Sequence, residues 1–176
     1  SWLQGKKMTR MILVSACLLG HKVKYDGKEN THGLLVEYNA RGRFLAVCPE
    51  CLARLPVPRP PMEIQAATGK QVLSGGAKVC DANGKDTTAY FIEGASRVLQ
   101  MAQAYHVKVA ILKESSPSCV HTVYDGTFAG RKTRGMGVTA ALLMKNGVRC
   151  YAEQDLTAAL LESLIAEDVA QDSVSS

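Results

Sequence analysis

Three cysteines of this sequence stand at the ends of apolar runs, where their thiols could do chemistry. They are Cys17 after residues 11–16, Cys48 after residues 44–47, and Cys119 shortly after residues 107–112. Short apolar runs of this kind are typical of buried strands. If these strands lie parallel in one sheet, all three thiols emerge at its carboxyl edge, where open α/β sheets bind their ligands. Thiols gathered there would bind a metal or take part in catalysis.

The segment 113–119, Lys-Glu-Ser-Ser-Pro-Ser-Cys, directly follows the third run. Serine and proline do not continue a central strand, so we expect a rigid turn that presents Cys119. The alternative is that each cysteine is simply a small buried residue at a strand end, which is common for free cysteines. The convergence of all three at one edge favours a site.

Three thiolates are sufficient to hold a [4Fe–4S] cluster in which one iron has no protein ligand. Full ligation of such a cluster uses four cysteines. A missing ligand leaves an open coordination position for substrate, as it does at a catalytic zinc ion. The open iron would act as a Lewis acid with high affinity for sulfur.

Cys48 also forms a C-x-x-C motif with Cys51, which is typical of a zinc site or of a dithiol redox pair. A structural zinc ion would need two further ligands, commonly from a second paired motif, and the sequence has none. A redox pair would open a helix, and residues 52–56 are a poor helix start of that kind. We therefore interpret Cys51 as incidental.

The composition predicts one soluble globular domain, since the 176 residues are 47% hydrophobic. No apolar stretch approaches the roughly 20 residues that span a bilayer, so we expect no membrane association. Residues 1–7 resemble a cloning remnant before a natural start at Met8, and they lack a secretion signal. We therefore expect a cytoplasmic protein whose six cysteines stay reduced. The formal net charge of +5 indicates at most a local anion site, not a general nucleic-acid surface.

Strand and helix patterns alternate along the chain. Helices are expected at 30–39, 88–105, 138–145 and 156–169, and a fourth strand at 148–152. This alternation, without repeats or a domain linker, predicts a single-domain three-layer α/β/α sandwich with a mainly parallel, Rossmann-like sheet. We expect the domain to span residues 8–170 and residues 171–176 to form a disordered tail.

Two segments depart from this alternation. Residues 71–73 and 77–80 flank Ser-Gly-Gly, and this pattern predicts a small β-hairpin insertion. Residues 55–64 contain several prolines, which exclude a helix or a central strand and stiffen the loop. A stiff loop beside the cysteine edge is expected to form a wall of the pocket.

Seven motifs carry a resemblance to a known family. In chain order they are Ser15-Ala16-Cys17-Leu18-Leu19-Gly20, Tyr25-Asp26-Gly27, Cys48-Pro49-Glu50, Leu55-Pro56-x-Pro58-Arg59-Pro60, Lys113-x-x-Ser116-Pro117-Ser118-Cys119, Tyr124-Asp125-Gly126-Thr127-Phe128 and Gly135-x-Gly137-Val138-Thr139-Ala140-Ala141-Leu142-Leu143. Together they resemble the successive signatures of the thiouracil desulfidase (TudS) family. The resemblance extends from Met8 to about Glu153. Val120 and the pair Ala53-Arg54 depart from it, because the family has glycine at these positions.

The resemblance implies a non-redox desulfidase that converts thiouracil-type bases, nucleosides or nucleotides to uracil and releases hydrogen sulfide. It also implies a [4Fe–4S] cluster held by Cys17, Cys48 and Cys119. The open iron would take the substrate sulfur and retain hydrosulfide as the cluster-bound product.

Four further residues are candidates for the reaction. Glu50 lies two residues after a presumed ligand, where its carboxylate could act as the base for an attacking water; the alternative is a surface or helix-capping glutamate. We assign Ser116 to catalysis, and Ser115 and Ser118 to substrate binding. The alternative for these serines is ordinary turn chemistry.

Three more residues are assigned to substrate binding. Arg134 and Gly137 stand at a glycine-opened helix start with basic neighbours, which is a suitable anion site. Arg59 could bind an anion from the proline-rich loop. The alternative for the basic helix start is that it simply lies beside the anionic cluster, and the alternative for Arg59 is a solvated surface position.

The expected partner is a small thiolated uracil derivative, and tRNA is not expected as a substrate because the domain carries no appended RNA-binding region. Two other functions stay open from the residues alone. One is the reverse chemistry, in which the same cluster passes sulfur to a nucleobase. The other is a non-catalytic zinc or redox-sensing nucleotide-binding module built on Cys48 and Cys51.

Overall fold

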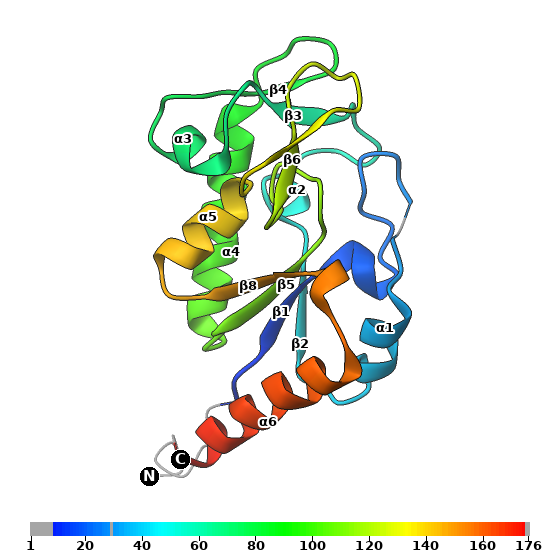
Figure 1. The fold of residues 1–176 in the computed structure, drawn as a ribbon, viewed down its shortest axis with the longest axis vertical. Helices are drawn as coiled ribbons and strands as arrows, with labels where there is room; N and C mark the ends of the chain where they lie inside the picture. The colour runs from blue at the N-terminus through cyan, green and yellow to red at the C-terminus, as the bar shows by residue number, and fades with distance from the viewer. Residues whose placement is uncertain (1–8, 29, 175–176) are drawn as a thin grey trace.

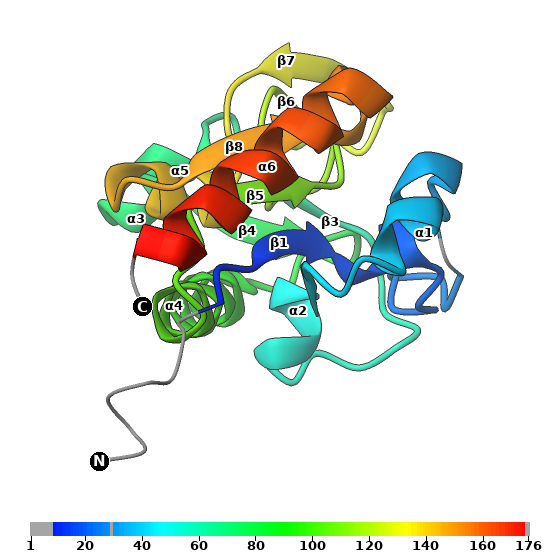
Figure 2. The ribbon, with the colours of Figure 1, turned by 90° about the horizontal axis from the view of Figure 1, so that it is seen from below.

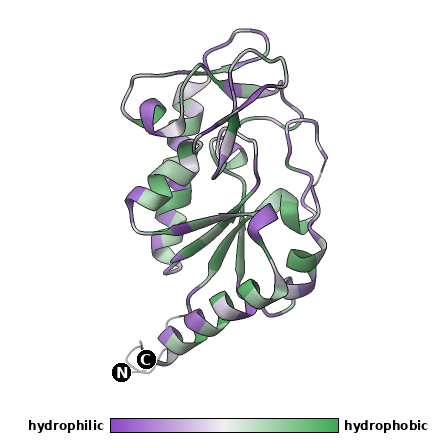
Figure 3. Ribbon diagram, viewed as in Figure 1, coloured by the Kyte–Doolittle hydropathy of each residue, from purple (hydrophilic) through white to green (hydrophobic). Residues whose placement is uncertain are grey.

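A four-stranded parallel sheet forms the centre of the molecule, in the order β2-β1-β5-β8 (Figure 1). The computed structural model describes residues 9–28 and 30–174. The strands are β1 (Ile12–Ser15), β2 (Phe44–Val47), β5 (Val109–Leu112) and β8 (Arg149–Ala152). Figure 3 shows them as mostly hydrophobic, which agrees with the apolar runs that predict them. Because all pairs are parallel, the four carboxyl ends lie at one edge.

The strand order reverses between β1 and β5. The chain leaves β1 for β2 on one side and leaves β5 for β8 on the other. Such a reversal opens a crevice outside the carboxyl ends of the two strands, and ligands of open α/β sheets bind there. The fold therefore places the ends of β1 and β5 where a site is expected.

Helices cover both faces of the sheet (Figure 2). On one face lie α4 (Thr88–Ala104) and α5 (Val138–Lys145), and on the other lie α1 (Gly33–Asn39) and α6 (Ala158–Val174). Strand side chains alternate between the two faces, so Leu13 packs with α4 and α5 while its neighbours pack with α1 and α6. The three-layer α/β/α sandwich predicted from the sequence is confirmed.

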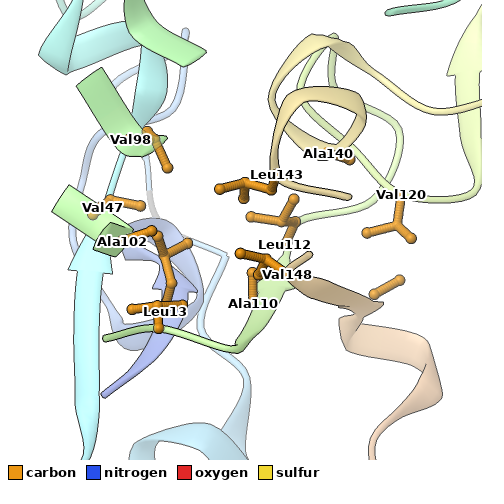
Figure 4. Close-up of a cluster of buried hydrophobic side chains, with 12 residues drawn as sticks. Leu13, Val47, Val98, Ala102, Ala110, Leu112, Val120, Ala140, Leu143 and Val148 are labelled. Atoms are coloured by element: carbon orange, nitrogen blue, oxygen red, sulfur yellow. The ribbon is translucent and has the colours of Figure 1, made fainter. Parts of the chain in front are cut away.

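Figure 4 shows the core between the sheet and the pair α4 and α5. Leu112 and Leu143 are 1% and 0% exposed there, and Val98 of α4 closes the same cluster. Burying a leucine side chain contributes about 1.5–3 kcal/mol. The end of β5, from which the Cys119 loop departs, is thus held in a dry and well-packed core.

A smaller antiparallel addition lies beyond the carboxyl edge of the sheet (Figure 1). It contains β3 (Met62–Ile64) paired with β4 (Val79–Asp81), and a hairpin of β6 (Thr122–Tyr124) with β7 (Lys132–Arg134) that the sequence did not reveal. A third hydrophobic cluster joins this addition to the upper parts of α4 and α5.

The predicted hairpin of residues 71–73 with 77–80 is wrong in its first strand. Residues 71–73 belong to α3 (Gly69–Leu73), and β4 pairs with β3 instead. The reason is a capping box, in which the Thr68 backbone N–H donates to Gln71 Oε1 at 2.8 Å and fixes the first helical turn. A three-residue apolar run alone does not distinguish a helix from a strand.

The two ends of the chain differ from expectation in one respect. The presumed cloning remnant, residues 1–7, lies outside the described residues. At the other end α6 continues to Val174, so residues 171–174 are helical rather than a disordered tail, and residues 175–176 again lie outside the described part. Asp172 fastens this end by accepting hydrogen bonds from the Arg10 backbone N–H and the Arg43 guanidinium, both at 2.7 Å. Within the described residues no helix is long and apolar enough to cross a membrane.

Candidate functional site

A cavity of about 480 Å³ opens at the carboxyl edge of the sheet, beside the ends of β1, β2 and β5. This volume lies in the range of small-molecule sites. Part of its wall is the proline-rich segment, through residues 59–62, as predicted from its stiffness. Seven of the residues predicted for the site line this cavity: Cys17, Cys48, Glu50, Arg59, Ser115, Ser116 and Ser118.

Two of the three predicted cysteine ligands face the cavity. Cys17 lies in the short 3-10 helix η2 (Ala16–Leu19) after β1, and Cys48 directly follows β2. Cys119 is wholly buried behind the cavity wall, and its Sγ donates a hydrogen bond to the carbonyl oxygen of Thr122. Among the described residues no three side chains of His, Cys, Asp or Glu are grouped closely enough to hold a metal ion.

The three thiols are held in their neutral form. Burial raises the pKa of Cys17 to about 11, and burial together with the Glu114 carboxylate raises the pKa of Cys119 to about 12. Burial and the neighbouring Glu50 carboxylate also raise the pKa of Cys48. Iron binds thiolates, so each of these cysteines would release a proton on taking iron.

The chemistry of these residues fits an iron–sulfur cluster. Cysteine thiolates are its usual ligands, and the three cysteines follow three adjacent strands of one sheet. An unpartnered polar atom lies in a residue of the cavity wall, because Glu114 lines the cavity and its buried Oε2 has no hydrogen-bond partner. Such an atom is expected beside a ligand that the polypeptide alone does not replace.

Three hydrogen bonds fasten the start of the Cys119 loop to neighbouring strands. The Lys113 backbone N–H donates to Ser15 Oγ at the end of β1, at 3.0 Å. Glu153, just after β8, accepts from the Glu114 backbone N–H at 3.0 Å and from Lys113 Nζ at 3.2 Å. The loop is therefore anchored on both sides of β5.

The Glu114 carboxylate organises the rest of this loop. Its Oε1 accepts hydrogen bonds from the backbone N–H groups of Ser115 and His121 at 3.2 Å and from that of Thr122 at 2.8 Å, and also from the Thr122 hydroxyl. Burial acts to raise the pKa of Glu114, but these hydrogen bonds outweigh it and hold the pKa below its usual value. An ionised and buried carboxylate thus defines the path of residues 115–122, which include Cys119.

Gly137 supports the same loop rather than lining the cavity. Its N–H donates to the Cys119 carbonyl oxygen at 2.8 Å. A Cβ atom at this position would lie 2.2 Å from the Pro117 carbonyl oxygen and 2.5 Å from the Cys119 nitrogen. Only glycine permits this close approach of two backbone segments.

Glu50 lies between a predicted ligand and the serine-rich loop. Its Oε1 accepts a hydrogen bond from the Ser118 hydroxyl at 3.2 Å, and its Oε2 lies 3.5 Å from Cys48 Sγ, which donates to it. The carboxylate is only partly buried and lines the cavity. It is therefore oriented by one loop and open to a molecule in the cavity.

The three serines on the cavity wall have different partners. Ser116 Oγ accepts from the Ser118 backbone N–H at 3.1 Å, which is the turn chemistry that was the alternative for this residue. An accepting hydroxyl still has its own proton to donate toward the cavity. Ser118 uses its hydroxyl on Glu50, and Ser115 adopts a left-handed backbone conformation with φ of +65°.

The two predicted arginines lie in different places. Arg59 lines the cavity, and its guanidinium donates to the carbonyl oxygens of Val23 at 3.0 Å and Pro56 at 3.1 Å. It therefore joins the proline-rich loop to the loop after β1. Arg134 is exposed at the end of β7 and does not line the cavity, whereas Lys132 of the same strand does.

Several cavity residues were not predicted from the sequence. Tyr25 and Tyr124 each begin a Tyr-Asp-Gly motif that signals a turn, and both line the cavity. Glu63 of β3 is 8% exposed, and its Oε1 accepts from the backbone N–H groups of Gly126 at 3.0 Å and Phe128 at 3.2 Å. Glu63 is thus a second buried carboxylate that organises a loop. Its position beside apolar residues of a strand was the sequence signal that could have predicted this role.

Cys51 lies in a helix, contrary to our expectation. Residues Pro49–Leu52 form the short helix α2, with Cys48 as its N-cap and proline at its first position. Proline is favourable there because its fixed φ suits the first turn and no N–H is needed. The objection that the C-x-x-C pair does not open a helix is therefore wrong.

Comparisons with known proteins find a family, a relative and a solved structure that are similar to this chain. The model of the 2-thiouracil desulfurase family matches residues 12–155. The uncharacterized protein YbbK of Bacillus subtilis (strain 168) is 42% identical over 147 residues, which are 83% of this chain and 97% of YbbK. The solved structure of a [4Fe-4S]-dependent thiouracil desulfidase, TudS, is 40% identical with a TM-score of 0.75, over 88% of this chain and 99% of that one.

Proposed function

The chain belongs to the 2-thiouracil desulfurase family, and from this premise we propose that it is a thiouracil desulfidase. The reaction replaces the thiocarbonyl sulfur of a thiouracil-type base by the oxygen of water, with uracil and hydrogen sulfide as products. Atoms balance without an oxidant or a reductant, because carbon keeps its oxidation state. The observation that carries the proposal is the set of thiols and one carboxylate, Cys17, Cys48 and Glu50, on a single cavity wall at the strand-order reversal.

Cys17, Cys48 and Cys119 would hold a [4Fe–4S] cluster at this wall. When bound, the cluster supplies an iron without a protein ligand, which polarises the thiocarbonyl group as a Lewis acid. The loop that carries Cys119 is held by Glu114, Gly137 and the anchors on β1 and β8 described above. These contacts fix the third ligand relative to the other two.

Glu50 is the base that takes a proton from the attacking water. A carboxylate is suited to this role when it lies within reach of the water and is held by a second group. The Ser118 hydroxyl supplies this support through its hydrogen bond to Oε1. The role of Ser118 is therefore to orient Glu50, in addition to forming part of the cavity wall.

Ser116 donates its hydroxyl proton into the cavity. Its oxygen is fixed by the Ser118 backbone N–H, so the O–H has a defined direction. Such a donor stabilises negative charge that develops on the substrate as water adds to the carbon. Ser115 and Arg59 line the binding space, and Arg59 also holds the loop after β1 against the proline-rich segment.

The substrate is a free small molecule rather than tRNA. The cavity of about 480 Å³ suits a thiolated base with or without its sugar, and the basic residues Lys24, Arg59 and Lys132 are among those that line it.

We place residues 8–170 in one catalytic domain. All six cysteines are free thiols. The use of Cys17, Cys48 and Cys119 as cluster ligands requires a reducing compartment, for which we propose the cytoplasm.

The test is turnover by the cluster-loaded enzyme. Anaerobically reconstituted protein is mixed with 4-thiouracil while the thiocarbonyl absorbance, uracil and free sulfide are followed together. We expect the absorbance to fall as uracil and sulfide appear in equal amounts without added reductant. Loaded protein that leaves 4-thiouracil and 2-thiouracil unchanged would refute the proposal.

A further inference from the structure

The Cys48-x-x-Cys51 pair has a geometry that the desulfidase reaction does not require. Cys48 is the N-cap of α2, with φ of −128° and ψ of 111°, and its carbonyl oxygen accepts from the Leu52 N–H at 3.0 Å. Cys51 therefore lies one helical turn after Cys48 and on the same side. A separation of about 5 Å between Cα atoms across one turn lies within the range that disulfides span.

The two thiols lie close together in space. Both Sγ atoms approach the carbonyl oxygen of Val23, at 3.9 Å from Cys48 and 4.0 Å from Cys51. After burial and the Glu50 carboxylate, the nearby Cys51 also influences the raised pKa of Cys48. The pair thus already faces a common point, and a rotation of the side chains is sufficient to bring the sulfur atoms together.

The two thiols differ in access. Cys48 lines the cavity, so a small reagent that enters the cavity reaches it first. Cys51 is half-buried like Cys48, but it is not among the residues that line the cavity. A cavity-lining thiol with a second thiol beside it suits a pair that closes a disulfide after the first thiol has reacted.

We propose that Cys48 and Cys51 form a reversible disulfide in the cluster-free enzyme when it meets a disulfide oxidant. The disulfide occupies Cys48 and so prevents cluster assembly until a thiol reductant reopens it. The first statement concerns the two cysteines alone, and the second rests on the proposed function, in which Cys48 is a ligand.

The chemistry is two successive thiol–disulfide exchanges. The Cys48 sulfur attacks a disulfide R–S–S–R, the S–S bond of the reagent breaks, and one RS⁻ leaves and takes up the proton that Cys48 gave up. The Cys51 sulfur then attacks the mixed disulfide at Cys48 and releases the second RSH. The protein dithiol is oxidised by two electrons, and the reagent is reduced to two thiols.

The experiment uses metal-free full-length protein and the small reagent bis(2-hydroxyethyl) disulfide at pH 8. Wild type, Cys51→Ser and the matched control Cys80→Ser are treated, freed of reagent, blocked with N-ethylmaleimide at any remaining free thiol and digested with trypsin. Arg43 and Arg54 flank a tryptic peptide, residues 44–54, that contains both cysteines. Its mass then shows whether a disulfide lies within it.

In wild type and Cys80→Ser we expect this peptide to be lighter by two hydrogen atoms. In Cys51→Ser we expect the hydroxyethyl adduct on Cys48 instead, because the second thiol is missing. Wild-type peptide that keeps both thiols, or that carries stable adducts, would overturn the proposal.

Cluster uptake separates this proposal from the proposed function. Oxidised wild type should take up less than a tenth of the iron and sulfide that reduced wild type takes up, and dithiothreitol should restore it. If the disulfide forms but iron and sulfide uptake stays normal, Cys48 is not a cluster ligand, and the proposal that the disulfide prevents cluster assembly is refuted. If reduced protein takes up no cluster while the disulfide forms, the proposed function fails and the disulfide stands.

Discussion

Replacing Glu114 by alanine tests how the Cys119 loop is held. The substitution removes the acceptor of three backbone N–H groups and one hydroxyl, which are partly buried around Oε1. A hydrogen bond to a charged group contributes about 1.5–3 kcal/mol, and several bonds to one oxygen add less than their sum. We therefore expect Glu114→Ala to lower the unfolding free energy of the cluster-free protein by about 3–5 kcal/mol.

The assay is thermal unfolding of the cluster-free protein, followed by iron uptake of the same sample. For a chain of this size each kcal/mol shifts Tm by roughly 2–4 °C, so a decrease of about 10 °C is expected. Iron uptake at a temperature well below Tm should also fall, because Cys119 no longer has a fixed position. Glu114→Gln should recover most of both, since the amide oxygen can take the place of Oε1 at a cost of about 1–2 kcal/mol.

Glu63→Ala is the matched control for this prediction. It also removes a buried carboxylate that accepts from loop N–H groups, but these belong to Gly126 and Phe128 in the loop between β6 and β7. We expect it to lower Tm while leaving iron uptake unchanged. A Glu114→Ala protein with Tm within 2 °C of wild type and full iron uptake would refute the role of this carboxylate.

Three further predictions follow from the site and its supports. Glu50→Gln should keep a full cluster but lose at least 100-fold in 4-thiouracil turnover, as general base catalysis is removed; unchanged turnover would contradict the assignment. Gly137→Ala should lower iron uptake at least several-fold, because its Cβ would meet the Pro117 carbonyl oxygen, and normal uptake would show that the two segments separate freely. Asp172→Asn should cost about 1–2 kcal/mol at pH 7. Burial alone would raise the pKa of Asp172, but the hydrogen bonds from Arg10 and Arg43 outweigh this effect. The pKa of Asp172 therefore lies below its ordinary value of 3.8. The stabilisation is therefore present above pH 3.8 and is lost as the pH falls through the folded-state pKa, so urea-unfolding curves of variant and wild type should converge in acid.

The positions of the site residues were largely predictable because they depend on strand ends. Three short apolar runs and residues 148–152 were recognised as strands because they alternate with helix patterns, and Cys17 and Cys48 follow two of these runs directly. The serine and proline content of the segment after β5 was sufficient to predict a loop there. Convergence at one edge then follows from parallel pairing.

The supports of the site were not predictable, because they depend on contacts between segments far apart in sequence. Glu114 could be seen beside the motif, but its bonds to residues 121 and 122 exist only once the loop turns back on itself. Gly137 was assigned to anion binding from its basic neighbours, whereas its place against Pro117 comes from tertiary packing.

Short sequence segments also led to two wrong predictions of secondary structure. Residues 71–73 suited a strand as well as a helix, and only the capping box with Thr68 decides between them. The helix at Cys51 was missed because its four residues make about one turn, which is too short for a periodic pattern, although Pro49 after an extended residue is a recognisable start.

The most direct test of the account is the iron and sulfide content of single cysteine-to-serine variants after anaerobic reconstitution. The account predicts about four irons and four sulfides per chain for wild type, Cys51→Ser and Cys80→Ser. Cys17→Ser, Cys48→Ser and Cys119→Ser should each lose the cluster while staying folded by circular dichroism. A stable, complete cluster in any of these three variants, or its loss in Cys51→Ser, would contradict the assignment of the ligands.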